Sequence, residues 1–199
     1  MDEKIILKKL KKMMPDNRYK HSLKTASMAG KLAKHFSLHP GKARLAGLLH
    51  DCAKGMSVEE MVKFYRQQKK NFTDGERIVA TNPVLLHSQI SACLAGRKFG
   101  VKDKEVLRAI ALHTTADRKM SVLDKIIYLA DMLSPERRYA ERKNIQQAAF
   151  QNLDKALLLG VVAKIKHVLS KKQSLYQKTV EAYNKLVEDK GGTHTQNKH

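Results

Sequence analysis

The sequence places a histidine and an aspartate side by side, His50 and Asp51, at the end of an apolar run. An imidazole and a carboxylate that leave hydrophobic surroundings together can satisfy their lone pairs on one metal ion. Asp131 ends a second apolar run, 126–130. Three further histidines could join them: His21, His87 and His113. Four imidazoles and two carboxylates are enough ligands for two metal ions.

The residue types indicate which metals to expect. Imidazole and carboxylate ligands without thiolate favour iron, manganese or another first-row divalent ion over a structural zinc site. A carboxylate can bridge two ions, and Asp51 is placed to do so. A single histidine on an apolar helical face is more often a hydrogen-bonded core residue, so the prediction depends on all six residues together.

Other histidines are not part of this prediction. His35 follows His21 by four helical turns, about 21 Å along a helix axis, and is too far away to share a site. His35, His39 and His167 are therefore interpreted as surface or helix-end residues. The six predicted ligands are widely separated in sequence apart from the adjacent pair, so several helices must bring them together, as in metal sites inside helical bundles.

The bulk composition suits one domain with a full core. The chain has 199 residues, of which 42% are hydrophobic, and we find no apolar stretch of membrane-spanning length and no secretory signal. Cys52 and Cys93 make no disulfide framework or zinc pattern, so we interpret them as small apolar residues in a reducing cytoplasm. A cytoplasmic protein without a membrane partner is expected.

The charge is the outlying bulk property. The 39 lysines and arginines against 19 acidic residues give a formal net charge of +20. Such a field favours polyanions: nucleic acid, phosphate-rich small molecules or the ribosome. Aromatic residues make up only 6% and tryptophan is absent, so a basic groove with stacking rings is not indicated. A plain basic surface and attraction of an anionic substrate both stay open.

Helical periodicity runs along almost the whole chain and predicts an all-α fold. The predicted helices cover about 2–14, 18–37, 40–51, 57–66, 84–99, 103–113, 121–133, 142–170 and 174–188. Segment 71–83 is predicted to be the least regular part, because it carries turn signals. We divide the chain into an N-terminal helix, 1–15, that is part of the domain or appended to it, a single domain, 16–188, and a disordered tail, 189–199.

The order of the six residues resembles the H…HD…D pattern of the HD-domain phosphohydrolase superfamily, with His87 and His113 marking its binuclear branch. Longer strings at 18–22, 48–54, 82–87, 113–115, 120–131 and 179–184 are similar to the YqeK family. That family comprises bacterial HD-domain enzymes that hydrolyse dinucleoside polyphosphates symmetrically. The resemblance covers about residues 16 to 187. Ser88 and Ala116 stand where the family usually has glycine, and the run 137–141 also departs from it.

The resemblance implies a single-domain helical bundle of the HD-domain type and a symmetrical bis(5'-nucleosyl)-tetraphosphatase, which cuts diadenosine tetraphosphate into two ADP. It also implies two metal ions, iron before manganese or another first-row ion, and a metal-bound hydroxide that attacks phosphorus. We assign His21, His50, Asp51 and Asp131 to one ion. His87, His113 and bridging Asp51 are assigned to the other.

Four further residues are predicted around the substrate. Lys54, three residues after Asp51, can return toward the metals on the next turn and neutralise phosphate charge, so both residues are predicted to be catalytic. By family position, Thr114, Thr115 and Arg137 are candidate phosphate contacts.

Two other functions stay open. One is an HD-domain phosphohydrolase of another kind, acting on nucleoside monophosphates, deoxynucleoside triphosphates or guanosine alarmones. The other is a basic RNA-binding or ribosome-associated protein, suggested only by the net charge. Nucleic acid is not expected as the main partner, and a homodimer is compatible with the sequence.

Overall fold

The computed structural model describes residues 3–136 and 140–191, and every regular element in these residues is a helix. The predicted all-α fold is therefore confirmed. In chain order the elements are α1 (Glu3–Met13), α2 (Asp16–His35), α3 (Pro40–Leu49), α4 (Val58–Gln67), the 3-10 helix η1 (Lys69–Asn71), α5 (Gly75–Thr81), the 3-10 helix η2 (Pro83–Leu85), α6 (Leu86–Phe99), α7 (Lys104–Leu112), α8 (Val122–Met132), α9 (Arg142–Ala149), α10 (Leu153–Ser170) and α11 (Gln177–Gly191).

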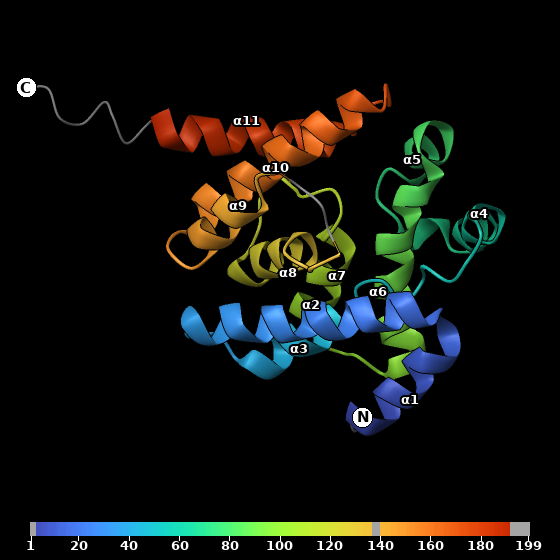
Figure 1. Cartoon of the computed structure of the whole chain (residues 1–199). Coiled ribbons are helices and arrows are strands. Elements are labelled where there is room, and N and C mark those ends of the chain that lie inside the picture. The colour runs from blue at the N-terminus through green and yellow to red at the C-terminus, as the bar shows by residue number, and fades with distance from the viewer. Residues whose placement is uncertain (1–2, 137–139, 192–199) are drawn as a thin grey trace, which may run out of the picture.

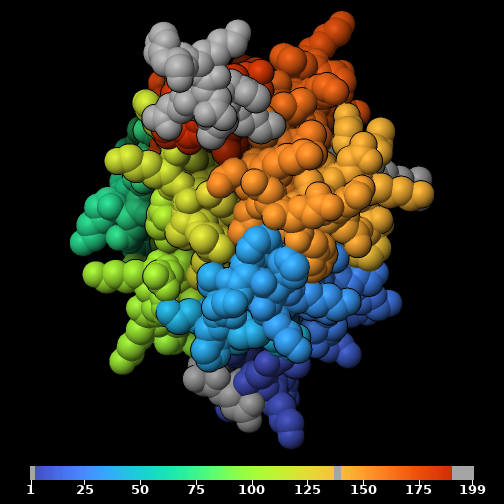
Figure 2. Space-filling model, turned by 90° about the vertical axis from the view of Figure 1, so that its left-hand side faces the viewer, coloured from blue at the N-terminus to red at the C-terminus, as the bar shows by residue number. Residues whose placement is uncertain are grey.

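Helices α7 and α8 lie in the centre of the molecule (Figure 1). Helices α2 and α3 pack on one side of α8, and α10 packs on it from another side and in turn contacts α9 and α11. Helix α6 packs against α7 and α4. The C-terminal helices thus complete a core begun by the N-terminal half, and Figure 2 shows segments from both halves meeting on one face. The ring of His35 at the end of α2 packs edge-on against that of Phe150 after α9, with ring centroids 5.5 Å apart.

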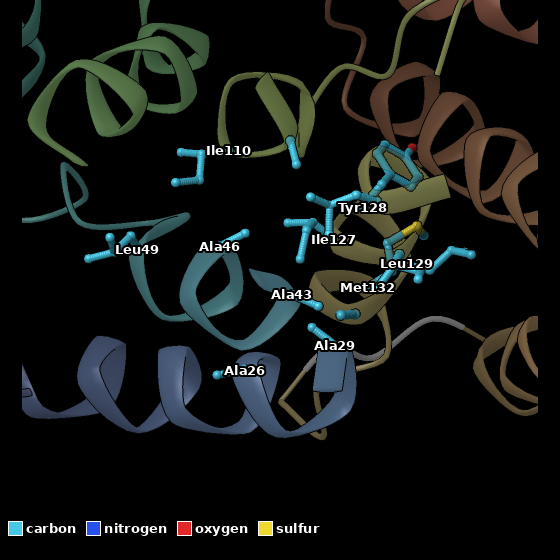
Figure 3. Close-up of a cluster of buried hydrophobic side chains, with 14 of the residues drawn as sticks. Ala26, Ala29, Ala43, Ala46, Leu49, Ile110, Ile127, Tyr128, Leu129 and Met132 are labelled. Carbon is cyan, nitrogen blue, oxygen red and sulfur yellow. The ribbon is translucent and has the colours of Figure 1, made fainter. Parts of the chain in front are cut away.

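Small residues bring α2 and α3 close together. Both helices present buried alanines to the core that α7 and α8 fill with larger side chains (Figure 3): Ala26, Ala29, Ala43, Ala46, Ile110, Ile127, Tyr128, Leu129 and Met132. At Gly47 of α3, an added Cβ would stand 2.8 Å from the Cα of Ala26. The missing side chain therefore sets the spacing of the two helices, and each of them carries one of the predicted ligands.

Several helix boundaries follow the side chains that cap them. Ser57 and Glu60 form the predicted capping box of α4, and Ser121 and Asp124 form a second one at α8. Gly100 ends α6 with a φ of 67°, a left-handed conformation that glycine adopts without strain. These caps explain why residue patterns alone located those helices.

One predicted helix is wrong. The helix expected over 142–170 is two helices, because the side chain of Asn152 accepts a hydrogen bond from the Lys155 amide at 2.9 Å and starts α10 there. Segment 71–83, expected to be the least regular part, contains α5 and the first residue of η2. Its turn signals are real, since Asp74 adopts a φ of 54°, but they precede a short helix that buries Ile78.

The remaining expectations concern the tail, the cysteines and membranes. Helix α11 extends to Gly191, and the rest of the predicted disordered tail, 192–199, lies outside the described residues. Cys52 is buried as predicted, whereas Cys93 is only half-buried. Among the described helices, none combines the length and apolar character needed to cross a lipid bilayer.

Candidate metal centre

The structure brings the six predicted ligands together in the interior. They come from α2, the end of α3, the start of α6, the end of α7 and α8, and all are buried: His21, His50, Asp51, His87, His113 and Asp131. The Nε2 atoms of His21 and His50 lie 3.2 Å apart, as do those of His87 and His113. Five elements thus aim their imidazole and carboxylate groups at one point.

Asp51 lies between the two histidine pairs. Its Oδ1 is 3.5 Å from Nε2 of His87 and 3.3 Å from Nε2 of His113. Its Oδ2 faces the other pair, 4.0 Å from His21 and 3.7 Å from His50. Both oxygens are buried without a hydrogen-bond partner among the described residues. A buried carboxylate without donors is costly, and cations on its two sides would remove that cost.

Asp131 completes one half of the centre. Its Oδ1 is 2.9 Å from Nε2 of His21 and 3.7 Å from Nε2 of His50. One atom of each of these three residues lies within 4.8 Å of the other two, and the same holds for His50, Asp51 and His113. His50 belongs to both groups, so the two halves of the centre adjoin at this residue. The donor set of imidazole and carboxylate fits first-row divalent ions.

Three of the four histidines are oriented by backbone carbonyl groups of their own turn. Nδ1 of His50 donates to Gly47 O at 2.7 Å, that of His113 to Ile110 O at 2.7 Å, and that of His87 to Val84 O at 2.5 Å. His50 and His113 are the C-cap residues of α3 and α7, where the last carbonyl groups have no intrahelical partner. These bonds leave the Nε2 lone pairs directed at the centre.

Electrostatics keep several of these groups in the form that coordinates metals. Burial, with help from the Lys54 ammonium, lowers the pKa of His87 well below its usual value, and burial also lowers the pKa of His113. Burial alone would raise the pKa of Asp51, but the neighbouring His50 holds it well below its usual value, and the carboxylate in turn raises the pKa of His50 against the effect of burial. A neutral imidazole and an ionised carboxylate are the forms that bind divalent ions.

A pocket of about 170 Å³ opens beside the centre, far larger than the roughly 15 Å³ that one water needs. It reaches the centre through Thr114, whose Oγ1 is 2.9 Å from Nε2 of both His87 and His113. Of the predicted substrate contacts, Lys54, Thr114 and Thr115 line this pocket. Arg137 lies outside the described residues.

The far wall of the pocket comes from the C-terminal helices. It includes Lys164 and His167 of α10 and segment 173–176. Thr179 fastens this wall by donating to Thr115 O at 2.7 Å, and Tyr176 donates to Asp74 at 3.0 Å. His167 is exposed, as the sequence indicated, but it also faces the pocket. No sequence spacing links these residues to the predicted ligands, which is why they were missed.

Two other residues at the centre were also missed. Nη1 of Arg18 lies 3.7 Å from Oδ2 of Asp51, and Oγ of Ser134 lies 3.0 Å from Nδ1 of His21. Arg18 is three residues before His21 and Ser134 is three residues after Asp131, so helical spacing from the ligands was the available signal. His39, by contrast, caps α3 through a bond from the Gly41 amide and takes no part in the site.

The chain is similar to known proteins over most of its length. The family model described as the HD domain matches residues 18–136. The chain is 32% identical to the symmetrical bis(5'-nucleosyl)-tetraphosphatase of Halalkalibacterium halodurans, covering 91% of this chain and 95% of that protein. It is 30% identical to the protein of that name from Bacillus subtilis, covering 89% and 94%.

A solved structure supports the fold. It is the crystal structure of an HD superfamily hydrolase from Clostridium acetobutylicum, described as involved in NAD metabolism. The TM-score is 0.88 and the sequence identity 35%, and the match covers 95% of this chain and 98% of that one.

Proposed function

The chain belongs to the HD-domain family of hydrolases, and from this premise we propose that it cleaves diadenosine tetraphosphate at its centre to give two molecules of ADP. The observation that carries the proposal is the carboxylate of Asp51, which is buried between two histidine pairs and has no hydrogen-bond donor among residues 3–136 and 140–191. The relatives from Halalkalibacterium halodurans and Bacillus subtilis are named for this activity, and their similarity to the chain extends over almost their whole length.

We propose that two divalent ions, iron before manganese, occupy the centre. His21, His50 and Asp131 would hold one ion, His87 and His113 the other, with Asp51 between them. When bound, such ions lower the pKa of a water molecule and neutralise charge on a phosphoryl group. The neutral imidazoles of His87 and His113 and the ionised Asp51 suit this role.

The surroundings of the centre suit a substrate with two similar halves. On the side of Oδ1 of Asp51, the pocket offers Lys54 and Lys164 for phosphate and apolar side chains for a nucleoside. On the side of Oδ2, the guanidinium of Arg18 is 40% exposed and lies 3.7 Å from that oxygen. We propose that one ADP half occupies the pocket and the other extends past Arg18. The scissile bond between the two central phosphates would then lie over Asp51.

The reaction consumes one water. Its oxygen forms a bond to one central phosphorus, the bond from that phosphorus to the bridging oxygen breaks, the bridging oxygen leaves on the other ADP as a phosphate anion, and the protons of the water pass to solvent. We propose that Lys54 neutralises the charge that accumulates on the phosphates during this exchange. Its ammonium is near enough to His87 to lower the pKa of that imidazole. Thr114 and Thr115 would hold the phosphate chain at the mouth of the pocket.

Identification of products from diadenosine tetraphosphate, with protein loaded separately with iron or manganese, tests the proposal. We expect ADP as the sole product, at two per substrate. AMP and ATP in equal amounts would contradict it, because they would mean that an outer phosphoanhydride bond is cut instead of the central one.

The same assay separates the alternatives left open by the sequence. Nucleoside monophosphates, deoxynucleoside triphosphates and a guanosine alarmone are tested as competing substrates. Faster turnover of any of these would favour another HD-domain phosphohydrolase. If the protein hydrolyses none of these nucleotides and binds RNA of any sequence with a steep dependence on salt, an RNA-binding role would be favoured. A cytoplasmic location and a homodimer stay predictions from the sequence.

A further inference from the structure

His21 is held differently from the other three histidines of the centre. His50, His87 and His113 each donate Nδ1–H to a backbone carbonyl three residues earlier. His21 lies inside the long helix α2, where carbonyl groups are occupied by the helix itself. Its Nδ1 instead contacts the hydroxyl of Ser134, 3.0 Å away and in the segment that follows α8.

Ser134 is in turn held by a chain of side chains. The Ser134 residue is buried, and its hydroxyl donates to the carboxylate of Glu136. Glu136 pairs with the ammonium of Lys24, which stands three residues after His21 on α2. The side chains of Lys24 and Glu136 are 49% and 41% exposed. The chain therefore begins at a buried imidazole and ends in solvent.

These contacts set the tautomer of His21. Since the Ser134 hydroxyl gives its proton to Glu136, its oxygen accepts from Nδ1–H of His21. This tautomer would leave the Nε2 lone pair of His21 for a metal ion, and Nε2 lies 2.9 Å from Oδ1 of Asp131 and 3.2 Å from Nε2 of His50. Partners that orient a ligating histidine in this way typically contribute about 10- to 100-fold to metal affinity.

We propose that Ser134, held by Glu136 and Lys24, is the positioning residue for His21, and that it selectively sustains metal binding at the position formed by His21, His50 and Asp131. The proposal rests on the two-ion centre of the proposed function. The position formed by His87 and His113 does not depend on Ser134, because the backbone orients both of its imidazoles.

The chain offers a matched control for a test of Ser134. Ser88 is also a buried serine, and it follows the ligand His87 directly. Its hydroxyl donates to Leu85 O at 3.1 Å. Ser88→Ala removes the same atom as Ser134→Ala, but leaves every hydrogen bond to an imidazole in place.

The experiment loads full-length proteins with Mn²⁺ and removes the metal with increasing concentrations of chelator. Metal per chain is measured, and electron paramagnetic resonance distinguishes a coupled pair of Mn²⁺ ions from a single ion. Wild type and Ser88→Ala are expected to lose the coupled signal together. Ser134→Ala should lose the coupled signal, together with one of its two ions, at a chelator concentration about 10- to 100-fold lower than wild type. Ser134→Thr, which keeps the hydroxyl, should restore wild-type behaviour.

A second variant tests whether Glu136 can take over the role of the lost Ser134 hydroxyl. Oε2 of Glu136 is 3.8 Å from Nδ1 of His21, so a small movement could let this carboxylate replace the lost hydroxyl. Ser134→Ala combined with Glu136→Ala excludes that replacement, and circular dichroism of the metal-free proteins confirms that they fold. If the combined variant keeps both ions like wild type, or loses both at the same chelator concentration, the proposal is wrong.

Failure of the proposed function would look different. A wild-type protein that binds two Mn²⁺ ions but does not cleave diadenosine tetraphosphate would overturn the assigned substrate and leave the metal titration unaffected. A protein that makes two ADP and whose metal binding is indifferent to Ser134 would overturn only the positioning role.

Discussion

Replacement of Gly47 by alanine tests whether the spacing of α2 and α3 sets the metal centre. An added Cβ would stand 2.8 Å from the Cα of Ala26, whereas ordinary contacts begin near 3.4 Å, so the helices must separate by about 0.6 Å. His50 lies three residues after Gly47 and hydrogen-bonds to its carbonyl, so this ligand would move with α3. Functional geometry tolerates only about 0.5 Å.

The expected magnitudes follow from two opposing effects. Overpacking costs about 1–3 kcal/mol, and alanine regains about 0.5–1 kcal/mol of it because it favours a helix interior more than glycine does. The metal-free variant should therefore be destabilised by about 1 kcal/mol, which lowers the Tm of a protein of this size by about 2–4 °C. Turnover at limiting metal should fall about tenfold or more, since His50 is displaced from its partners.

Gly96→Ala is the matched control. It also places a methyl group in a helix, but the nearest atom outside that helix is 3.7 Å away. This variant should gain about 0.5–1 kcal/mol and keep full metal content. Thermal unfolding in chelator and metal analysis after reloading measure both effects. If Gly47→Ala behaves like Gly96→Ala in both assays, the close approach of α2 and α3 does not position His50.

Three further outcomes are expected. Asp51→Ala should abolish metal content and turnover with helical circular dichroism retained, and residual hydrolysis by this variant would contradict the proposed centre. Lys54→Met should retain the metals and lose turnover; loss of metal instead would refute its assigned role. Although burial opposes it, Lys24 and Ser134 lower the pKa of Glu136 from its ordinary 4.5 to about 2. This group therefore adds stability that is present above about pH 4.5 and is lost as the pH falls toward 2. The free energy of unfolding of the metal-free protein, measured in urea, should fall over this pH range in wild type and not in Glu136→Gln. The same pH dependence in both proteins would contradict this assignment to Glu136.

The sequence predicted the helices best where residue type determines their ends. Ser57, Asp103 and Ser121 each start a helix with a side-chain bond to a backbone amide, and such caps depend only on neighbouring residues. Asn152 forms the same kind of cap. It was overlooked because the apolar periodicity continues through the break at 150–152, and periodicity alone does not detect an interruption that keeps the apolar face in phase.

The candidate centre was predictable because its residues are chemically unusual where they stand. Carboxylates and imidazoles that end apolar runs indicate a shared partner for their lone pairs, and the structure gathers them around Asp51. Lys164 carries no such signal, since a lysine is ordinary anywhere on a helical protein. Its place in the pocket wall arises from how α10 packs on α8, and packing between distant helices has no local pattern in the sequence.

The outer wall of the pocket lies at 164–176, beyond the HD-domain match at 18–136. Two side-chain hydrogen bonds, from Thr179 to Thr115 O and from Tyr176 to Asp74, tie it to the rest of the molecule. The groups that would hold the ions thus lie in the earlier stretch of the gene, whereas the later stretch encodes the outer wall of the pocket. Exchange of the later stretch between relatives offers evolution, or an engineer, a way to redirect recognition while the hydrolytic machinery stays unaltered.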